Sequence, residues 1–268
     1  MGLVELLLTA ETGVRLSVFA VVLACMIIWE RLKPHRPTLL SRSRRWFSAL
    51  SLAVINSVLV RLAAPLLGTG VAVRAASQQT GLLNQIDLPF AAEILIAMLI
   101  LDLVVYWQHR LFHLVPLLWR FHRVHHADPD VDTTTGLRFH PVEALISMVV
   151  KLATVYLLGA DVTAVILFEV LLNASSLFNH ANIRLPFDYF FRWLIVTPGM
   201  HRVHHSIIPH EHNRNFGFSF PWWDRLFGSY LARGSTESDL GLTVFREEEH
   251  QQLFELLKQP FISSKPAH

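Results

Sequence analysis

Residues 121–130 read Phe-His-Arg-Val-His-His-Ala-Asp-Pro-Asp, and the motif His122-Arg-Val-His125-His126 recurs as His201-Arg-Val-His204-His205. Residues three and four apart share one face of a helix, so each copy directs three imidazoles to one side. With 15 histidines in 268 residues, chance predicts roughly 0.05 occurrences of H-x-x-H-H. Two copies with dissimilar flanks therefore indicate shared chemistry rather than a duplicated module.

A third window, His109-Arg-Leu-Phe-His113, brings the number of clustered histidines to eight. An isolated pair of this kind is ordinarily a solvated or hydrogen-bonded feature of a helix. Eight converging imidazoles without a metal, however, would repel one another when protonated and leave buried donors unsatisfied. Imidazole binds zinc, copper, iron or nickel, and eight ligands suit two ions with incomplete coordination spheres better than one tetrahedral zinc. Spacing does not choose the metal.

The composition indicates a membrane protein. Hydrophobic residues make up 52% of the chain and charged residues 16%, which is too apolar for an ordinary soluble domain. The formal net charge of +2, without basic runs interleaved with aromatics, excludes a nucleic-acid partner. A single cysteine, Cys25, rules out a disulfide framework and a thiolate metal site. Nitrogen or oxygen ligands must hold any metal.

Apolar segments predict an all-α integral membrane bundle. A spanning helix needs roughly 20 apolar residues, and three full spans are expected near residues 14–29, 47–71 and 88–107. Two shorter segments, 142–158 and 162–178, are joined by three residues and predict a helical hairpin. The loop 31–45 carries six basic residues, so it is expected in the cytosol together with a histidine-rich helical cap.

The chain is expected to form one membrane-embedded domain over residues 1–233, with the histidine motifs inside residues 102–230. A C-terminal cytosolic tail follows over residues 234–268. In it, apolar residues alternate with charges near residues 246–258, which predicts a short amphipathic helix.

Several further motifs accompany the histidine windows. They are Tyr106-Trp107-Gln108-His109-Arg110, Phe139-His140-Pro141-Val142-Glu143, Asn179-His180-Ala181-Asn182, Thr197-Pro198-Gly199-Met200-His201, Asn215-Phe216-Gly217 and Trp222-Trp223-Asp224-Arg225-Leu226-Phe227-Gly228. In order and separation, the chain resembles the fatty acid hydroxylase and sterol desaturase superfamily, with its HxxxH, HxxHH and later HxxHH boxes. The resemblance implies two iron ions held by nine histidines: His109, His113, His122, His125, His126, His180, His201, His204 and His205.

Three other residues are candidates for supporting these ligands, because a metal-bound imidazole usually passes its other N–H to a carboxylate or carbonyl. Asp102 lies seven residues before His109 and either accepts such a bond or makes a polar contact inside the bundle. His140 is a ligand, a supporting residue or a helix-start residue beside Pro141. Glu143 is a weaker candidate for a supporting role.

The resemblance further implies activation of O2 and attack on a C–H bond of a lipid, by hydroxylation or desaturation. The chain has no G-x-G-x-x-G loop, cysteine iron–sulfur pattern or haem-binding His-Pro-Gly-Gly segment, so a separate ferredoxin or cytochrome with an NAD(P)H reductase is expected to supply electrons. Four arginines form a candidate basic surface for the carrier, and solvated arginines facing lipid headgroups explain the same residues equally well: Arg120, Arg123, Arg138 and Arg202. The compact size of the chain, 268 residues, favours a bacterial inner-membrane protein.

Two other classes of function stay open from sequence alone. A non-catalytic membrane metal-binding or transport protein would carry polar residues through its spans, whereas the first two spans are mostly apolar, with Arg15 and Arg61 as exceptions. A zinc-dependent membrane hydrolase would carry a motif such as H-E-x-x-H, and none occurs. The lipid itself is not specified by the sequence.

Overall fold

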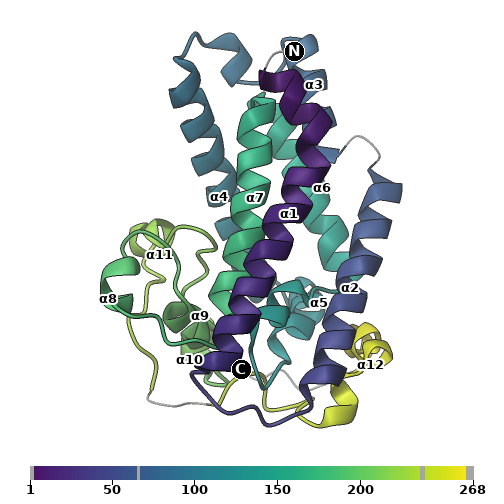
Figure 1. The fold of residues 1–268 in the computed structure, drawn as a ribbon, viewed down its shortest axis with the longest axis vertical. Coiled ribbons are helices and arrows are strands. Elements are labelled where there is room, and N and C mark those ends of the chain that lie inside the picture. Colours follow the sequence, from purple (N-terminus) through teal and green to yellow (C-terminus); the bar gives the residue numbers. More distant parts are fainter. Residues whose placement is uncertain (1–2, 65–66, 236–238, 264–268) are drawn as a thin grey trace.

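The computed structural model describes residues 3–64, 67–235 and 239–263, with side chains from residue 11 onward. Five long helices run along the long axis of the molecule (Figure 1). They are α1 (Leu3–Leu32), α2 (Arg42–Ala63), α4 (Phe90–Leu114), α6 (Pro141–Leu158) and α7 (Val162–His180). No strand occurs among the described residues, which confirms the all-helical prediction.

The remaining helices are short. Most gather toward the end of the bundle opposite the N-terminus, as Figure 1 shows for α5, α9, α10 and α12. The α-helices are α3 (Leu67–Ser77), α5 (Pro116–His126), α8 (Asp188–Phe191), α9 (Pro198–His204), α10 (Pro209–His212), α11 (Trp222–Leu226) and α12 (Leu253–Lys258); the 3₁₀ helices are η1 (Leu83–Gln85), η2 (Thr133–Leu137), η3 (Glu248–Gln251) and η4 (Gln259–Phe261).

Five helical segments are long and apolar enough to cross a membrane, which makes this a multi-pass membrane protein. The predicted second span is two helices, α2 and α3. The first of them ends at Ala63 because Ala64 precedes a proline, and the residue before proline avoids the helical conformation. With 18 and 19 residues, α6 and α7 are each about 27 Å long and reach span length.

The predicted hairpin between α6 and α7 is present, and its turn has a clear local cause. Pro141 occupies the first turn of α6, where its missing N–H costs nothing. Gly159 ends the helix with φ at 68°, a left-handed conformation that glycine adopts readily. Asp161 then begins α7 by accepting a hydrogen bond from the Thr163 amide at 2.7 Å. The chain therefore reverses direction between the two helices, and α3 and α4 each pack against both of them.

A core of small and branched side chains lies between α3, α4, α6 and α7. Ala97 and Leu101 of α4 are buried together with Val155 of α6 and with Val165 and Phe168 of α7. Alanine lets these backbones approach closely, as in other membrane helix pairs. This packing brings the C-terminal ends of α4 and α7, which carry histidines, toward each other.

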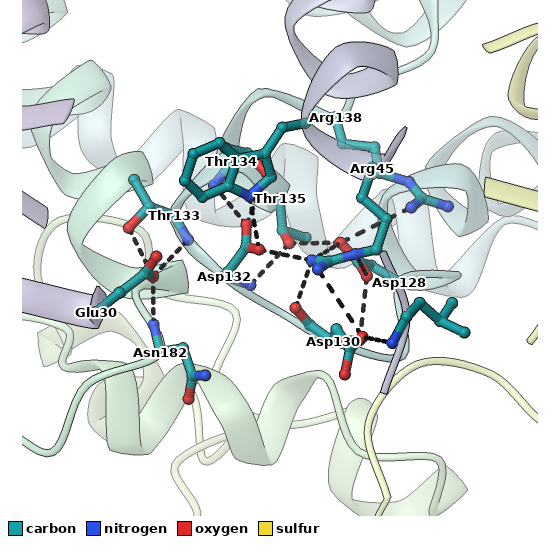
Figure 2. A network of polar contacts seen from close by, with 12 residues as sticks. Glu30, Arg45, Asp128, Asp130, Asp132, Thr133, Thr134, Thr135, Arg138 and Asn182 are labelled. Carbon is teal, nitrogen blue, oxygen red and sulfur yellow. Dashed lines mark hydrogen bonds and ion pairs between the residues drawn. The ribbon is translucent and has the colours of Figure 1, made fainter. Parts of the chain in front are cut away.

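A buried polar network joins α1 and α2 to the segment that follows α5 (Figure 2). The Arg45 guanidinium of α2 contacts Asp128 at 2.9 Å and Asp132 at 2.8 Å. From α1, Glu30 accepts hydrogen bonds from Thr133, from both its amide and its hydroxyl, and from the Asn182 amide. Because Asp128 lies two residues after His126, the network fixes the chain beside the histidines.

The C-terminal helix α12 packs against the helical body. Leu256 is fully buried against Leu52 of α2 and Val124 of α5, while Phe254 on the opposite side is exposed. This division of apolar and exposed positions is the amphipathic pattern expected for the tail. The division of the chain into residues 1–233 and 234–268 stays a prediction.

Candidate metal centre

Nine buried or half-buried histidines form two adjacent groups. In each group the candidate ligand atoms, one from every residue, all lie within 4.8 Å of one another. The first group holds five residues and the second four: His109, His113, His122, His126 and His204, then His125, His180, His201 and His205. These are the nine histidines that the sequence singled out, brought together from four helices.

The two identical boxes divide their histidines between the groups in opposite ways. In α5, His122 and His126 join the five-histidine group and His125 joins the other. In the second box, His201 and His205 join the four-histidine group and His204 crosses to the first. Each box thus gives its i, i+4 pair to one centre and its i+3 residue to the other.

Hydrogen bonds to Nδ1 orient four of the rings. His109, His180 and His204 place Nδ1 at 2.8, 2.6 and 2.8 Å from the carbonyl oxygens of Phe216, Ser176 and Arg214 respectively. His122 places Nδ1 2.7 Å from Glu143 Oε1. Each ring then donates through Nδ1 and turns Nε2 toward its group, the arrangement typical of metal-ligating histidine.

The chemistry of the two groups fits bound metal. Nε2 of His122 and of His204 is buried without a hydrogen-bond partner among the described residues. Other nitrogens face one another directly, as His201 Nε2 and His180 Nε2 do at 2.9 Å. Burial, reinforced by neighbouring imidazoles, holds the pKa of His204 and of His205 well below the ordinary value, so both are neutral and able to ligate.

The three candidates for supporting roles have different surroundings. Glu143, on the first turn of α6, contacts the His122 ring. Asp102 instead accepts hydrogen bonds from the Trp223 indole at 2.8 Å and the Ser219 amide at 3.3 Å. His140 accepts one from the Val142 amide at the start of α6, 3.2 Å away. Among the described contacts, Asp102 and His140 reach none of the nine histidines, which favours their structural alternatives.

Sequence reasoning missed the role of Asp224, although its motif was noted. The Asp224 carboxylate accepts hydrogen bonds from the amides of Phe216 at 2.8 Å and Gly217 at 2.7 Å. The Phe216 carbonyl in turn contacts His109. The ring of Phe216 packs against three histidines of the first group: His109, His113 and His204. The short spacing between Asn215-Phe216-Gly217 and Asp224 was the sequence feature that could have indicated this role of Asp224.

A tenth histidine lies beside the first group. The His212 ring stacks on Trp119 at 5.6 Å between centroids and lies 5.9 Å from the ring of His113. Its position soon after the second H-x-x-H-H box was visible in the sequence, but its spacing matches no box. His212 is itself buried beside the first group.

The prediction that four arginines form a basic surface for an electron carrier is largely wrong. Arg138 is 2% exposed and Arg123 is 5% exposed. Arg138 bonds to the Val124 carbonyl and the Gln251 side chain, while Arg123 contacts the carbonyl of Gln259. Arg202 is half-buried and donates to the carbonyls of Ala181 and Ile183. Of the four arginines only Arg120 is exposed, and the other three bind carbonyls or side chains of the helical cap.

A cavity of about 530 Å³ extends from the histidines into the bundle. Its walls include His109, His122, His125 and His201 at one end. Apolar side chains line much of the rest, among them Leu101, Phe112, Met148, Phe168 and Leu172. Its volume falls in the range of small-molecule sites, and its lining suits an alkyl chain.

Comparison with known proteins places these motifs in context. The sequence pattern of the family described as fatty acid hydroxylase matches residues 94–229, half of the chain. The ornithine lipid hydroxylase OlsE of Rhizobium tropici is 28% identical over 84% of this chain and 70% of its own length. An alkylglycerol monooxygenase of Xenopus tropicalis is 31% identical over 48% of this chain and 28% of its own.

The sphinganine C4-monooxygenase 2 of Arabidopsis thaliana is 29% identical over 53% of this chain and 55% of its own length. This chain therefore spans only part of the eukaryotic relatives that it matches. No solved structure matches it significantly. The named relatives are all hydroxylases or monooxygenases, which are oxidoreductases.

Proposed function

Because the chain belongs to the fatty acid hydroxylase family, we propose that this oxidoreductase is a membrane-bound lipid hydroxylase that holds two iron ions and uses O2. The first ion would be held by the five-histidine group and the second by the four-histidine group. The observation that carries the proposal is the cavity, whose apolar walls end at histidines from both groups.

When bound, the iron pair would supply the activation of dioxygen and removal of hydrogen from an unactivated C–H bond. The chain's own residues place the substrate: the walls of the cavity hold an alkyl chain and exclude water from its inner end. Glu143 keeps a proton on Nδ1 of His122, and backbone carbonyls do the same for His109, His180 and His204.

Hydroxylation is favoured over desaturation by the names of the relatives, which are hydroxylases and monooxygenases of ornithine lipid, alkylglycerol and sphinganine. These substrates share a polar head on an alkyl chain, and we propose a lipid of this general form. We propose that the histidine end lies on the cytosolic side of a bacterial inner membrane. The basic loop 31–45 supports the cytosolic side, and the Rhizobium relative supports the bacterial membrane.

Metal analysis tests the iron proposal. The protein, purified in detergent from iron-replete cells, should contain about two irons per chain. The double variant His125→Ala, His204→Ala removes one ligand from each group and should lose most of this iron. Stoichiometric zinc in the unaltered protein would contradict the proposal and favour a zinc-dependent hydrolase. An iron-free, folded protein would favour a non-catalytic role.

We further propose that electrons enter at a surface pocket beside the first histidine group. Arg110, His210, Arg214 and Phe216 line this pocket, which has a volume of about 470 Å³. Phe216 packs against three of the histidines, and the Arg214 carbonyl contacts His204. Two arginines here would attract an acidic ferredoxin or cytochrome, as complementary charge generally speeds association.

Charge reversal tests this surface. Arg214→Glu should lower the rate supported by an acidic ferredoxin and its NADPH reductase by about tenfold at low salt, with a smaller effect at high salt. The rate with dithionite should change little. Arg184→Glu, at an exposed arginine outside the pocket, is the control. Equal losses with both electron sources would show that Arg214 acts on the metal centre rather than on the carrier.

A further inference from the structure

Four charged side chains meet within the membrane-spanning helices, far from the histidines. Nη1 of Arg15 on α1 lies 2.6 Å from Glu11 and 2.6 Å from Glu169 of α7. Lys151 of α6 forms an ion pair with the other carboxylate oxygen of Glu169. Charged residues within membrane spans are costly, and they generally have a function. Here they link α6 to α1 and α7, which pack against each other.

The two cations, and not the two carboxylates, line the cavity that reaches the histidines. The Arg15 side chain is 27% exposed and that of Lys151 is 20% exposed, whereas that of Glu169 is 3% exposed. The Glu169 carboxylate therefore stands behind the cations. The formal charges of the four side chains cancel, but the groups that a cavity ligand meets at this end are the two cations.

Both cations keep hydrogen-bond donors for a further acceptor. Among the described residues, the two ion pairs of Arg15 use Nη1, which leaves Nε and Nη2. Lys151 has three donors and one ion-pair partner in the same part of the chain. Asn56, Gln108, Ser147 and Asn173 add polar groups to the cavity wall.

The charged end of the cavity and its histidine end are separated by a distance that an alkyl chain can span. Lys151 follows Glu143 by eight residues on α6, which corresponds to about 12 Å of helix. On α7, Glu169 precedes His180 by eleven residues, or about 16 Å. Apolar residues such as Leu101, Phe168 and Leu172 line the cavity between them.

We propose that Arg15 and Lys151 form a subsite for an anionic group, a carboxylate or a phosphate, on an alkyl chain that extends to the histidines. Guanidinium and ammonium groups are the usual partners of such anions. The subsite deepens the proposed function and rests on it for the role of the anion as part of a substrate. The carbon presented to the histidines is then set by its distance from the anionic group.

Binding of three probes with the same alkyl chain tests the subsite without requiring activity: lauric acid, dodecyl phosphate and dodecanol. With the full chain in lipid nanodiscs, we expect at least one anionic probe to bind about tenfold or more tightly than the alcohol. The stronger of the two anions assigns carboxylate or phosphate. Equal binding of all three would overturn the proposal.

Matched variants separate a ligand subsite from a purely structural ion network. Lys151→Gln should weaken anion binding about tenfold or more, whereas Lys151→Arg, which keeps the positive charge, should bind the anion about as tightly as the unaltered protein. Glu169→Gln removes the competing carboxylate and should keep or strengthen anion binding. Arg74→Gln, at an exposed arginine that does not line the cavity, is the control. If Lys151→Gln and Glu169→Gln lose binding and thermal stability alike, the network is structural.

Product analysis adds a readout that depends on the proposed function. In acids or phosphates of increasing chain length, the hydroxylated carbon should keep a constant distance from the anionic group. A position that is constant from the methyl end would overturn the subsite even if hydroxylation occurs. Anion binding without hydroxylation would contradict the proposed function and leave the subsite supported.

Discussion

Nδ1 of His122 lies 2.7 Å from Oε1 of Glu143, on the first turn of α6. The contact connects a candidate metal ligand of α5 to a helix whose later turns line the cavity. A carboxylate in this position fixes the tautomer of the ring and makes its other nitrogen a stronger ligand. Ring orientation in the first group is thus coupled to the cavity wall.

Glu143→Gln should weaken metal binding in the first group by about 10–100-fold, since the amide no longer carries the charge that supports the His122 ring. Competition with a chelator, followed by metal analysis, measures the change. Asp102→Asn is a matched control, because Asp102 bonds to Trp223 and Ser219 instead. We expect that variant to keep its metal and to unfold at a lower temperature. Unchanged metal retention in Glu143→Gln would contradict the role of Glu143.

The two histidine groups should lose metal separately. His113→Ala removes a ligand atom from the five-histidine group, and His201→Ala removes one from the four-histidine group. Because each residue belongs to one group, each variant should retain close to one metal ion per chain under mild chelation. Metal titration of the purified variants measures this. Loss of both ions from either variant would show that the groups bind metal only as a unit.

The helix-forming boxes made the clustering of histidines predictable, but not its division. Spacing places His122, His125 and His126 on one side of α5, and the side of a helix is all that spacing specifies. That His125 joins a different group from its neighbour His126 depends on the path of α7 and α9, which bring His180 and His201. Long-range packing, which spacing does not encode, decided that assignment.

The arginines show the same limit. From the sequence, Arg123 and Arg138 are expected at the surface, because arginine is mostly exposed in proteins. Both are buried because partners from the C-terminal segment, Gln259 and Gln251, reach them in space. Conversely, the sequence showed Arg15 as an exception within an apolar span. Its partner Glu169, which it shares with Lys151, comes close to it only in the folded arrangement of α1, α6 and α7.

Stability should fall in acid through the Asp128 network. Burial alone would raise the pKa of Asp128, but Arg45 and Arg138 outweigh it and hold the pKa below the ordinary value. Between the folded and unfolded pKa the native state binds fewer protons, so the free energy of unfolding decreases as pH falls below about 4. Denaturant unfolding at several pH values measures this slope.

Asp128→Asn is the variant that checks the assignment to this carboxylate. It removes a charge that Arg45 contacts at 2.9 Å, and at neutral pH the loss of one partner of a buried pair costs about 3–5 kcal/mol. Its stability should then depend less on pH in the acid range than that of the unaltered protein. The same slope in both proteins would assign the acid sensitivity to other groups.

Gly136→Ala should disturb His180 through a shared carbonyl. A Cβ on Gly136 would lie 2.5 Å from the Ser176 carbonyl oxygen, which no side chain tolerates without a backbone shift. The same oxygen contacts His180 Nδ1 at 2.6 Å, so the shift would misplace this ring. We expect about 1–3 kcal/mol of destabilisation and weaker metal binding in the four-histidine group.

Gly13→Ala is the control for this substitution, since no heavy atom lies within 4 Å of its added Cβ. In a helix it should leave stability unchanged or raise it slightly, because alanine favours the helical conformation over glycine. Thermal unfolding with metal analysis of both variants separates the two effects. If Gly136→Ala loses stability but keeps its full metal content, η2 supports the fold without positioning His180. If it loses both, close packing of η2 on α7 is part of what holds the metal ligand in place.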